Sequence, residues 1–350
     1  MGLLMTDETG KRIAGALELI SASKYAETLT DFKAIQKIVR AGGASDVFTI
    51  GDQIIPKWRA TNGTEYDFPF DIVKIGEVTL KDGEVKPAIY LQSHYATLNG
   101  IQFDHGENEK VTEEKYSADY FYYRQNSGDN WKLLVAGTDY NVGDTITDRN
   151  LVHSAIKDST GYIVTYGYNR WSHSAIRQYL NSNAGAGQWW KAQHLGDVAP
   201  DQLASVDGFM KGFSQDFLDV LGKAKVTTML NTVSEPDKTL GSEDTYDTFW
   251  LPSLEQIFAN PQASGEGSYF PYWKEACGRT TPTPWYKTWE EGGHPITYAL
   301  ENHNSAQHVR LRSASRGNSC HAWYVYSSGN VGNYHYAISA FRCAPACVIC

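Results

Sequence analysis

Short apolar segments separated by turn-forming dipeptides recur along most of the chain. From Val47 onward three of them follow one another, VFTIGDQIIPKW, FPFDIVKIGEVTL and AIYLQSHYA, and Gly51-Asp52, Asn62-Gly63 and Asp82-Gly83 mark turns within and between them. Segments of this length and pattern predict short β-strands. The chain is therefore expected to form a domain that is rich in short, irregular strands.

Helical periodicity is confined to a few segments. Across residues 11–43 apolar residues recur at spacings of three and four, Thr30-Asp31 offers a cap for a second helix, and Gly42-Gly43 ends it. This N-terminal segment is interpreted either as an ordinary amphipathic helix pair or as an attachment or oligomerisation element.

Two more helices are predicted in the middle of the chain. Residues 172–182 have Ser172 as a plausible N-cap, and their apolar face consists of Ala175, Ile176, Tyr179 and Leu180. A further helical region is expected at 201–223. The segment VTTMLNTV then predicts a strand, and DTFWLPSLEQIF predicts a strand followed by a helix. The expected fold class is α+β, with two main helices.

Composition and charge exclude several classes of function. The 350 residues are 41% hydrophobic and 20% charged, enough for one large domain or two ordinary ones. The net charge of -9 disfavours binding to nucleic acid or to an anionic membrane surface. No apolar run approaches the roughly 18 residues of a transmembrane helix, and the N-terminal sequence does not resemble a signal peptide. We therefore expect synthesis in the cytoplasm.

The cysteines do not predict a disulfide framework, because five is an odd number and four of them lie within residues 320–350. The spacing of Cys343, Cys347 and Cys350, with Cys320 and His321 nearby, allows a zinc site. The interpretation that we favour is a buried terminal strand, in which cysteine behaves as a small apolar residue.

Catalytic and metal-binding motifs are weak throughout. The chain contains no P-loop, no dinucleotide-binding glycine motif, no nucleophile elbow and no His-Glu-x-x-His motif. The acidic pairs Glu290-Glu291 and Asp244/Asp247 are interpreted as solvated loops. Glu235-Pro236-Asp237 resembles the tripeptide that binds calcium and sugar in animal lectins, but a simple turn explains it equally well. We predict no catalytic residue, no metal and no cofactor.

The C-terminal region has an unusual composition. After Glu301 the chain contains no Asp, Glu or Lys, and the segment CHAWYVYSSGNVGNYHY at 320–336 is built from Tyr, Trp, His, Asn, Ser and Gly. Antibody paratopes use the same residue types, because Tyr and Trp offer large contact areas and Ser, Gly and Asn adaptable hydrogen bonds. The alternative is an ordinary tyrosine-rich sheet.

Short strands are predicted in this region in HVRLRS, AWYVYSSG, NYHYAIS and APACVIC, with a turn at Ser328-Gly329. The alternation in HAWYVYS places Ala322, Tyr324 and Tyr326 on one face and Trp323 and Val325 on the other.

Several stretches together resemble a known family. RWSHSAIRQYLNS (170–182), TFWLPSLEQIF (248–258), VRLRSAS (309–315), VYSSGNV (325–331) and APACVIC (344–350) occur in the order found in phage and prophage proteins with a C-type-lectin-like domain. FTIGDQI (48–54) and FDIVKIG (70–76) resemble the opening strands of that domain. Many members are variable proteins of diversity-generating retroelements. The chain departs from the family pattern at Val309-Arg310 and Arg342-Cys343.

The resemblance implies a domain organisation and a source of the unusual composition. It implies an N-terminal helical attachment or oligomerisation segment at 1–44 and a C-type-lectin-like ligand-binding domain at 45–350. Residues 105–150 are more polar and contain the alternating pieces ADYFYYRQ and WKLLVAG, so they are interpreted as a β-rich insertion in that domain. The resemblance also implies a variable region near 308–343, in which adenine-directed mutagenesis rewrites Asn codons into a set that includes Ser, Tyr, His and Arg but not Lys or Glu. Trp323 does not fit such an origin and is expected to be fixed.

The resemblance further implies a ligand-binding face held on a constant core of Leu311, Val325, Val331 and Val348. The residues predicted for this face are His308, Arg310, Arg316, Ser319, His321, Tyr324, Asn333, His335, Ala337, Ser339, Phe341 and Cys343.

The implied function is a virion-associated receptor-binding protein, and the expected ligand is a host-surface protein or glycan. Virion tail or capsid proteins and a second copy of the chain are further candidate partners, whereas no nucleic acid or membrane is expected. Two alternatives stay open. One is a formylglycine-generating type of oxidase with Cys320 and Cys343 as its cysteine pair, and the other is a structural virion component without a ligand.

Overall fold

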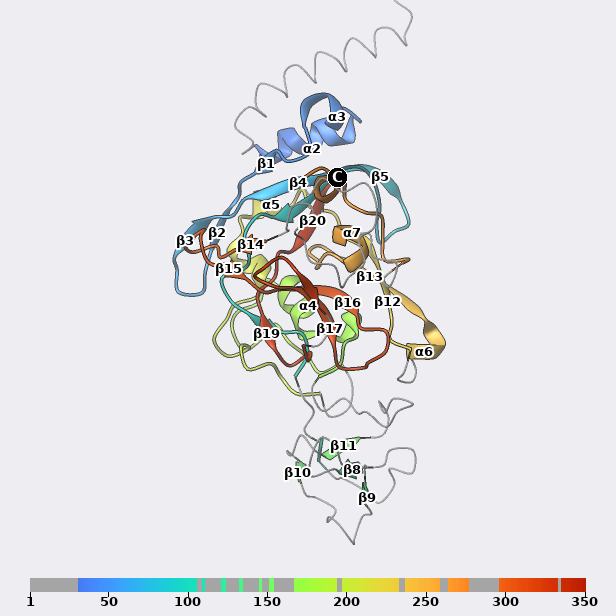
Figure 1. The fold of residues 1–350 in the computed structure, drawn as a ribbon. Helices are drawn as coiled ribbons and strands as arrows, with labels where there is room; N and C mark the ends of the chain where they lie inside the picture. The colour runs from blue at the N-terminus through green and yellow to red at the C-terminus, as the bar shows by residue number, and fades with distance from the viewer. Residues whose placement is uncertain are drawn as a thin grey trace, which may run out of the picture.

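The computed structural model describes residues 31–105, 167–193, 197–232, 237–258, 264–276, 296–332 and 335–350, together with the backbone of five short strands between 109 and 153. The helix predicted before residue 31, Cys277, Glu290-Glu291 and Asn333 lie outside the described residues. The described part is a mixed α+β structure of many short strands and few short helices (Figure 1). The predicted fold class is confirmed at this level.

A four-stranded antiparallel sheet joins the two ends of the described chain. Its order is β1 (Gln53–Ile54), β4 (Phe70–Thr79), β5 (Val85–Ser93) and β20 (Ala346–Ile349). Strands β4 and β5 form a hairpin, whose turn contains Gly83 at a φ of 83°. Strand β20 pairs with β5 from Ala346 to Ile349, so the C-terminal segment lies beside the first hairpin.

Helix α2 (Phe32–Arg40) packs against this sheet, and the short helix α3 (Ala44–Val47) follows it. The carboxylate of Asp31 accepts a hydrogen bond from the Ala34 backbone N–H at 3.0 Å, as the sequence predicted. Ile35 and Val39 are fully buried in the same hydrophobic cluster as the sheet. Helix α2 therefore helps to form the core of the main domain.

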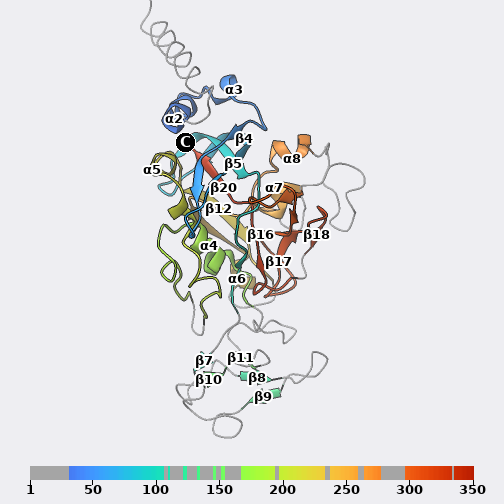
Figure 2. The same ribbon diagram turned by 90° about the vertical axis from the view of Figure 1, so that its left-hand side faces the viewer.

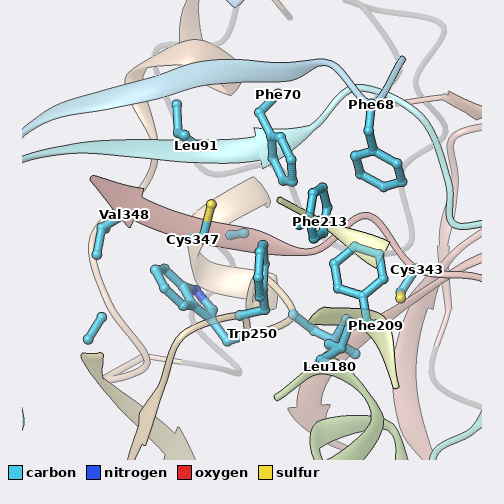
Figure 3. Close-up of a cluster of buried hydrophobic side chains, with 14 of the residues drawn as sticks. Phe68, Phe70, Leu91, Leu180, Phe209, Phe213, Trp250, Cys343, Cys347 and Val348 are labelled. Carbon is cyan, nitrogen blue, oxygen red and sulfur yellow. The ribbon is translucent and has the colours of Figure 1, made fainter. Parts of the chain in front are cut away.

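Aromatic rings fill the centre of this cluster (Figure 3). The Phe213 ring stacks on Phe249 with their centroids 5.6 Å apart, and it meets Phe68 edge-on at 5.6 Å. Phe209 contacts Phe213 at 5.1 Å. Offset and edge-on pairs of this kind stabilise a core beyond the apolar area that they bury. They also connect the sheet to the middle segment of the chain.

The middle segment contains less helix than the sequence predicted. At 201–223 only the 3-10 turn η3 (Phe209–Gly212) and helix α5 (Gln215–Leu218) form, since Phe213 and Ser214 adopt extended backbone conformations between them. From this interrupted segment, Phe209, Phe213 and Phe217 all enter the aromatic core.

Helix α4 (Ala175–Leu180) follows the 3-10 turn η2 (Trp171–His173). The predicted apolar face of α4 is confirmed, since its four members are all buried: Ala175, Ile176, Tyr179 and Leu180. The N-cap is Ser174 rather than Ser172, because the Ser174 hydroxyl accepts from the Arg177 backbone N–H at 3.3 Å. Ser172 lies within η2, where its hydroxyl donates to the carboxylate of Glu243 at 2.8 Å.

A second hairpin follows, with β12 (Ala224–Met229) paired to β13 (Ser242–Asp247) and helix α6 (Asp237–Leu240) between them. Helices α7 (Leu254–Phe258) and α8 (Pro271–Ala276) come next. The interpretation of Asp244 and Asp247 as a solvated loop is wrong, because both lie in β13. Asp247 is buried, and it accepts from Arg177 Nε at 2.8 Å and from Trp171 Nε1 at 3.0 Å.

The C-terminal sheet consists of β16 (Val309–Ala314), β17 (Ala322–Val325) and β18 (Val331–Gly332), which stand together on the right of Figure 2. Trp323 and Val325 enter a second hydrophobic cluster with Leu311, whereas Ala322 enters the central cluster. The predicted alternation of this strand is therefore confirmed.

Six more strands of the main body form small antiparallel pairs. These are β2 (Lys57–Arg59) with β3 (Glu65–Asp67), β6 (Ile101–Gln102) with β19 (Ala340–Phe341), and β14 (Thr297–Tyr298) with β15 (Ala306–Gln307).

Five further strands fall in the predicted insertion and just beyond it. Strand β7 (Glu109–Lys110) pairs with β10 (Thr145–Ile146), and β8 (Phe121–Tyr123) lies between β9 (Lys132–Leu134) and β11 (Leu151–His153). Figures 1 and 2 show these strands apart from the main body, at the end opposite α2. Among the described helices, none combines the length and the apolar character needed to cross a bilayer.

Candidate functional site

The partly exposed side chains above β16, β17 and β19 form a surface that we call the C-terminal face. Its members are His308, His321, Tyr326, His335, Tyr336, Ser339 and Phe341. The rings of four members lie around the buried ring of Tyr324, with centroids 4.6 to 6.1 Å from it: His308, Tyr326, His335 and Phe341. The His335 ring lies 4.8 Å from Tyr324 and 4.9 Å from Phe341. His321 and Tyr336 meet at 4.8 Å.

Arg310 lies next to these rings and is 1% exposed. Its guanidinium donates to the main-chain carbonyl oxygens of Ala322 at 2.9 Å, His335 at 3.3 Å, Tyr336 at 3.0 Å and Ser339 at 3.1 Å. It has no carboxylate partner among the described residues, and the Phe341 ring lies 4.6 Å from the guanidinium carbon. Arg310 therefore attaches the segment 335–339 to the sheet.

Burial lowers the pKa of Arg310 to about 9, so the side chain is still cationic at neutral pH. A buried cation is costly unless hydrogen bonds replace its water. Here the four carbonyl oxygens supply that replacement, and the aromatic rings add a favourable cation–π contact.

Asn169 attaches the loop 315–321 to the body of the domain in the same way. It is fully buried, and its amide nitrogen donates to the main-chain oxygens of Ser315 at 3.3 Å, Asn318 at 2.6 Å and His321 at 2.8 Å. The amide nitrogen of Asn231 donates to the side-chain oxygen of Asn169 at 3.1 Å and so fixes its orientation. The loop 315–321 is thus held from below through its backbone.

Two imidazoles of the face, those of His321 and His335, are shifted toward the neutral form. Burial, with smaller effects from Arg310 and His335, lowers the pKa of His321 to about 4. Burial also lowers the pKa of His335, and the positive charge of Arg310 adds to the effect. Arg342, beside the face, forms a bidentate ion pair with Glu301 at 2.7 and 2.8 Å. At neutral pH His321, His335 and the aromatic rings therefore make this part of the face polar without adding charge.

The structure divides the residues that the sequence predicted for the binding face. His308, Arg316, His321, His335, Ser339 and Phe341 are partly exposed, and all but Arg316 belong to the C-terminal face. The prediction is wrong for the buried members, whose side chains are 2% exposed or less: Arg310, Ser319, Tyr324, Ala337 and Cys343.

The physical reasons for this correction differ between residues. The hydrogen-bonding groups of Arg310 are directed at backbone carbonyls, Tyr324 lies among the rings of the face, and Ala337 belongs to the central core. Ala337 also carries main-chain bonds, since its carbonyl accepts from the Phe103 N–H at 2.9 Å. Asn169 was not predicted as a functional residue, although it directly precedes the segment RWSHSAIRQYLNS (170–182).

The cysteines behave as the favoured interpretation predicted. Cys320, Cys343, Cys347 and Cys350 are free thiols that the structure places in the interior. Burial raises the pKa of Cys343 to about 12, so its reactive thiolate is scarce at neutral pH. Within the described ranges, no three or more His, Cys, Asp or Glu side chains are grouped so that they could hold a metal ion. Leu311, Val325, Val331 and Val348 are buried as predicted.

Comparison with known proteins identifies the family of the chain. Residues 143–350 match the model of a domain of unknown function, DUF6273. This match covers more than half of the sequence, and the chain therefore belongs to that family. No curated protein and no solved structure shows significant similarity to it.

Proposed function

We propose that this member of the DUF6273 family is a ligand-binding protein whose C-terminal face is diversified in sequence while its fold stays constant. The proposed ligand is a protein or glycan on the surface of a bacterial host, and the proposed setting is a phage or prophage virion. Diversification by a retroelement is the mechanism suggested by the resemblance of the sequence to variable proteins with a C-type-lectin-like domain.

The observation that carries this proposal is the way in which the two loops of the face are attached. Arg310 and Asn169 contact the two loops through six main-chain carbonyl oxygens, and Arg310 also contacts that of Ala322 in β17. Every residue type presents the same carbonyl oxygen, so these contacts do not depend on which side chains the loops carry. A surface held in this way tolerates changes of its exposed side chains at little cost in stability.

The chemistry of the face also suits recognition. Tyr326, Tyr336 and Phe341 provide aromatic area, and neutral His321 and His335 provide hydrogen-bonding groups. The core of a protein interface is typically rich in aromatic residues and poor in Lys and Glu. Each binding site can have modest affinity, because several copies on one virion bind a cell together.

We further propose that the domain is a C-type-lectin-like variant. The pairing of the C-terminal strand β20 with the hairpin β4–β5 supports this assignment, and so does the large proportion of short, irregular strands. The resemblance of the quoted sequence stretches supplies the rest of the argument.

Two libraries of the full chain displayed on yeast would test the function. In the face library, His308, His321, His335, Ser339 and Phe341 are randomised. In the matched control library, the same number of buried positions is randomised: Asn169, Arg310, Ser319, Tyr324 and Ala337. Protease resistance reports folding, and selection against several unrelated bait proteins reports binding.

We expect most members of the face library to resist protease as the parent does, and most members of the buried library to be degraded. Specific binders should emerge from the face library. If both libraries lose protease resistance equally often, or if no bait selects a binder, the proposal of a diversified binding face is wrong.

A further inference from the structure

A second site lies in a cavity of about 200 Å³ that contains no residue of the C-terminal face. Hairpin β4–β5, the first half of β12 and the loop 265–270 surround it. Tyr90, Trp250 and Phe270 form an aromatic corner of the cavity, with the Tyr90 ring 6.1 Å from Phe270 and 6.4 Å from Trp250. This corner offers an apolar wall to a ligand.

Lys74 brings a positive charge to that wall. Its ammonium nitrogen lies 4.9 Å from the centre of the Tyr90 ring and donates to the Ser268 hydroxyl at 3.0 Å. An ammonium group has three hydrogens, so it can still donate to a ligand. Partial burial lowers the pKa of Lys74, and no carboxylate in the described part of the chain pairs with it.

Gln256 adds a second donor with a fixed orientation. Its side-chain oxygen accepts from Arg312 Nη1 at 2.8 Å and from the Ser253 backbone N–H at 3.0 Å. The amide nitrogen is then left without an acceptor among the described residues. Because Gln256 lines the cavity, this nitrogen is positioned to donate to a ligand there.

The charge of the lining is positive overall. Three cations, Lys74, Lys225 and Arg312, line the cavity with one carboxylate, Glu266. Lys225 is neutralised by Asp244 at 2.9 Å, and Glu266 is buried close to Arg312, whose guanidinium donates to the Glu266 main-chain oxygen. Lys74 is the cation without a compensating carboxylate. A cavity with this charge favours an anion over a cation or a neutral molecule of the same shape.

From this geometry we propose that the cavity binds a small organic carboxylate. The carboxylate group would accept hydrogen bonds from Lys74 and from the amide nitrogen of Gln256, and the apolar body of the ligand would pack against Tyr90 and Phe270. Such a site is separate from the diversified face, and it does not depend on the function proposed for that face.

Isothermal titration calorimetry on the full chain at neutral pH and low salt tests the proposal, with benzoate as the probe. Benzamide serves as the neutral analogue, and inorganic phosphate as an anion without an apolar body. We expect saturable binding of benzoate, and about tenfold weaker binding of benzamide, since a hydrogen bond to a charged group contributes this much. Lys74→Met should weaken the binding of benzoate by about tenfold for the same reason.

Lys57→Met is the matched control, because Lys57 pairs with Asp67 on the exposed hairpin β2–β3 and does not line the cavity. It removes the same charge and should leave the affinity for benzoate unchanged. NMR of the unmutated chain gives a test that needs no variant, in which benzoate should shift the side-chain amide signal of Gln256. Failure of benzoate to saturate overturns the proposal. Equal weakening by Lys57→Met, or tighter binding of phosphate than of benzoate, also overturns it.

Discussion

The substitution Arg310→Met tests whether a buried arginine holds the C-terminal face in place. The side chain is 1% exposed and donates four hydrogen bonds to backbone carbonyls, most of them in the segment 335–339. Methionine has a similar length, so it fills much of the same space while removing every donor. The substitution therefore isolates the anchoring hydrogen bonds from packing.

The expected cost follows from these contacts. A hydrogen bond to a charged group contributes about 1.5–3 kcal/mol, but burying a guanidinium without a carboxylate partner offsets part of the sum. We expect a net loss of about 3 kcal/mol in the free energy of unfolding. Domains are typically stable by about 5–15 kcal/mol, so the variant should still fold but be markedly weakened.

Urea denaturation measures the loss, and hydrogen exchange of residues 335–341 locates it. The backbone amides of this segment should exchange much faster in Arg310→Met than in the parent. The control is Arg316→Met, at a partly exposed position, which should change stability by less than about 0.5 kcal/mol. If Arg310→Met is as stable as the control and its segment exchanges at the parent rate, the guanidinium does not anchor the face.

Three further predictions follow from the same structure. Asn169→Ala should cost about 2 kcal/mol and speed hydrogen exchange in the loop 315–321, whose carbonyls it binds; unchanged exchange there would contradict its anchoring role. Burial raises the pKa of Glu266 from 4.5 to about 7, so the stability that its protonated form contributes is complete below pH 4.5 and lost as pH rises through 7. In urea denaturation at a series of pH values, the free energy of unfolding of Glu266→Gln should therefore rise relative to that of the parent between about pH 5 and 8. If the difference between the two free energies does not change with pH, Glu266 does not titrate in this range. Ile35→Ala should lower the free energy of unfolding of the whole domain by about 2–5 kcal/mol, because α2 belongs to the central core. A thermal melt should show one transition at a lower temperature than in the parent. If α2 melts separately while the rest of the domain keeps the parent melting temperature, α2 does not belong to the central core.

Local patterns in the sequence predicted much of the fold. The strands around Phe70 and Ile89, the cap of α2 at Asp31 and the buried face of α4 follow from periodicity and from capping residues near in sequence. The alternation around Trp323 was predicted for the same reason, since adjacent side chains of a strand point to opposite faces. The extent of helix at 201–223 was overestimated, because the chain is extended at Phe213 and Ser214 while three Phe residues of this segment enter the core.

The anchors of the C-terminal face could not be predicted in this way. A charged residue in a short polar strand suggests exposure, and the burial of Arg310 depends on carbonyls that lie 12 to 29 residues further along the chain. The acceptors of Asn169 are 146 to 152 residues away. Contacts at such distances in sequence are set by the tertiary fold. His335 and Phe341 were predicted as binding residues from composition and from the family resemblance; the structure shows that they are partly exposed, and their binding role stays a prediction.

We propose that exposed residues of the C-terminal face vary while their anchors, Arg310 and Asn169, stay constant. The most direct test is deep sequencing of the 3′ end of this gene, with its flanking DNA, in a natural population. We predict variation at the codons of exposed residues such as His321, His335 and Phe341, at adenines of a nearby template copy, with Arg310 and Asn169 unchanged. An invariant region without a template, or variation at Arg310 as frequent as at His335, would contradict the claim.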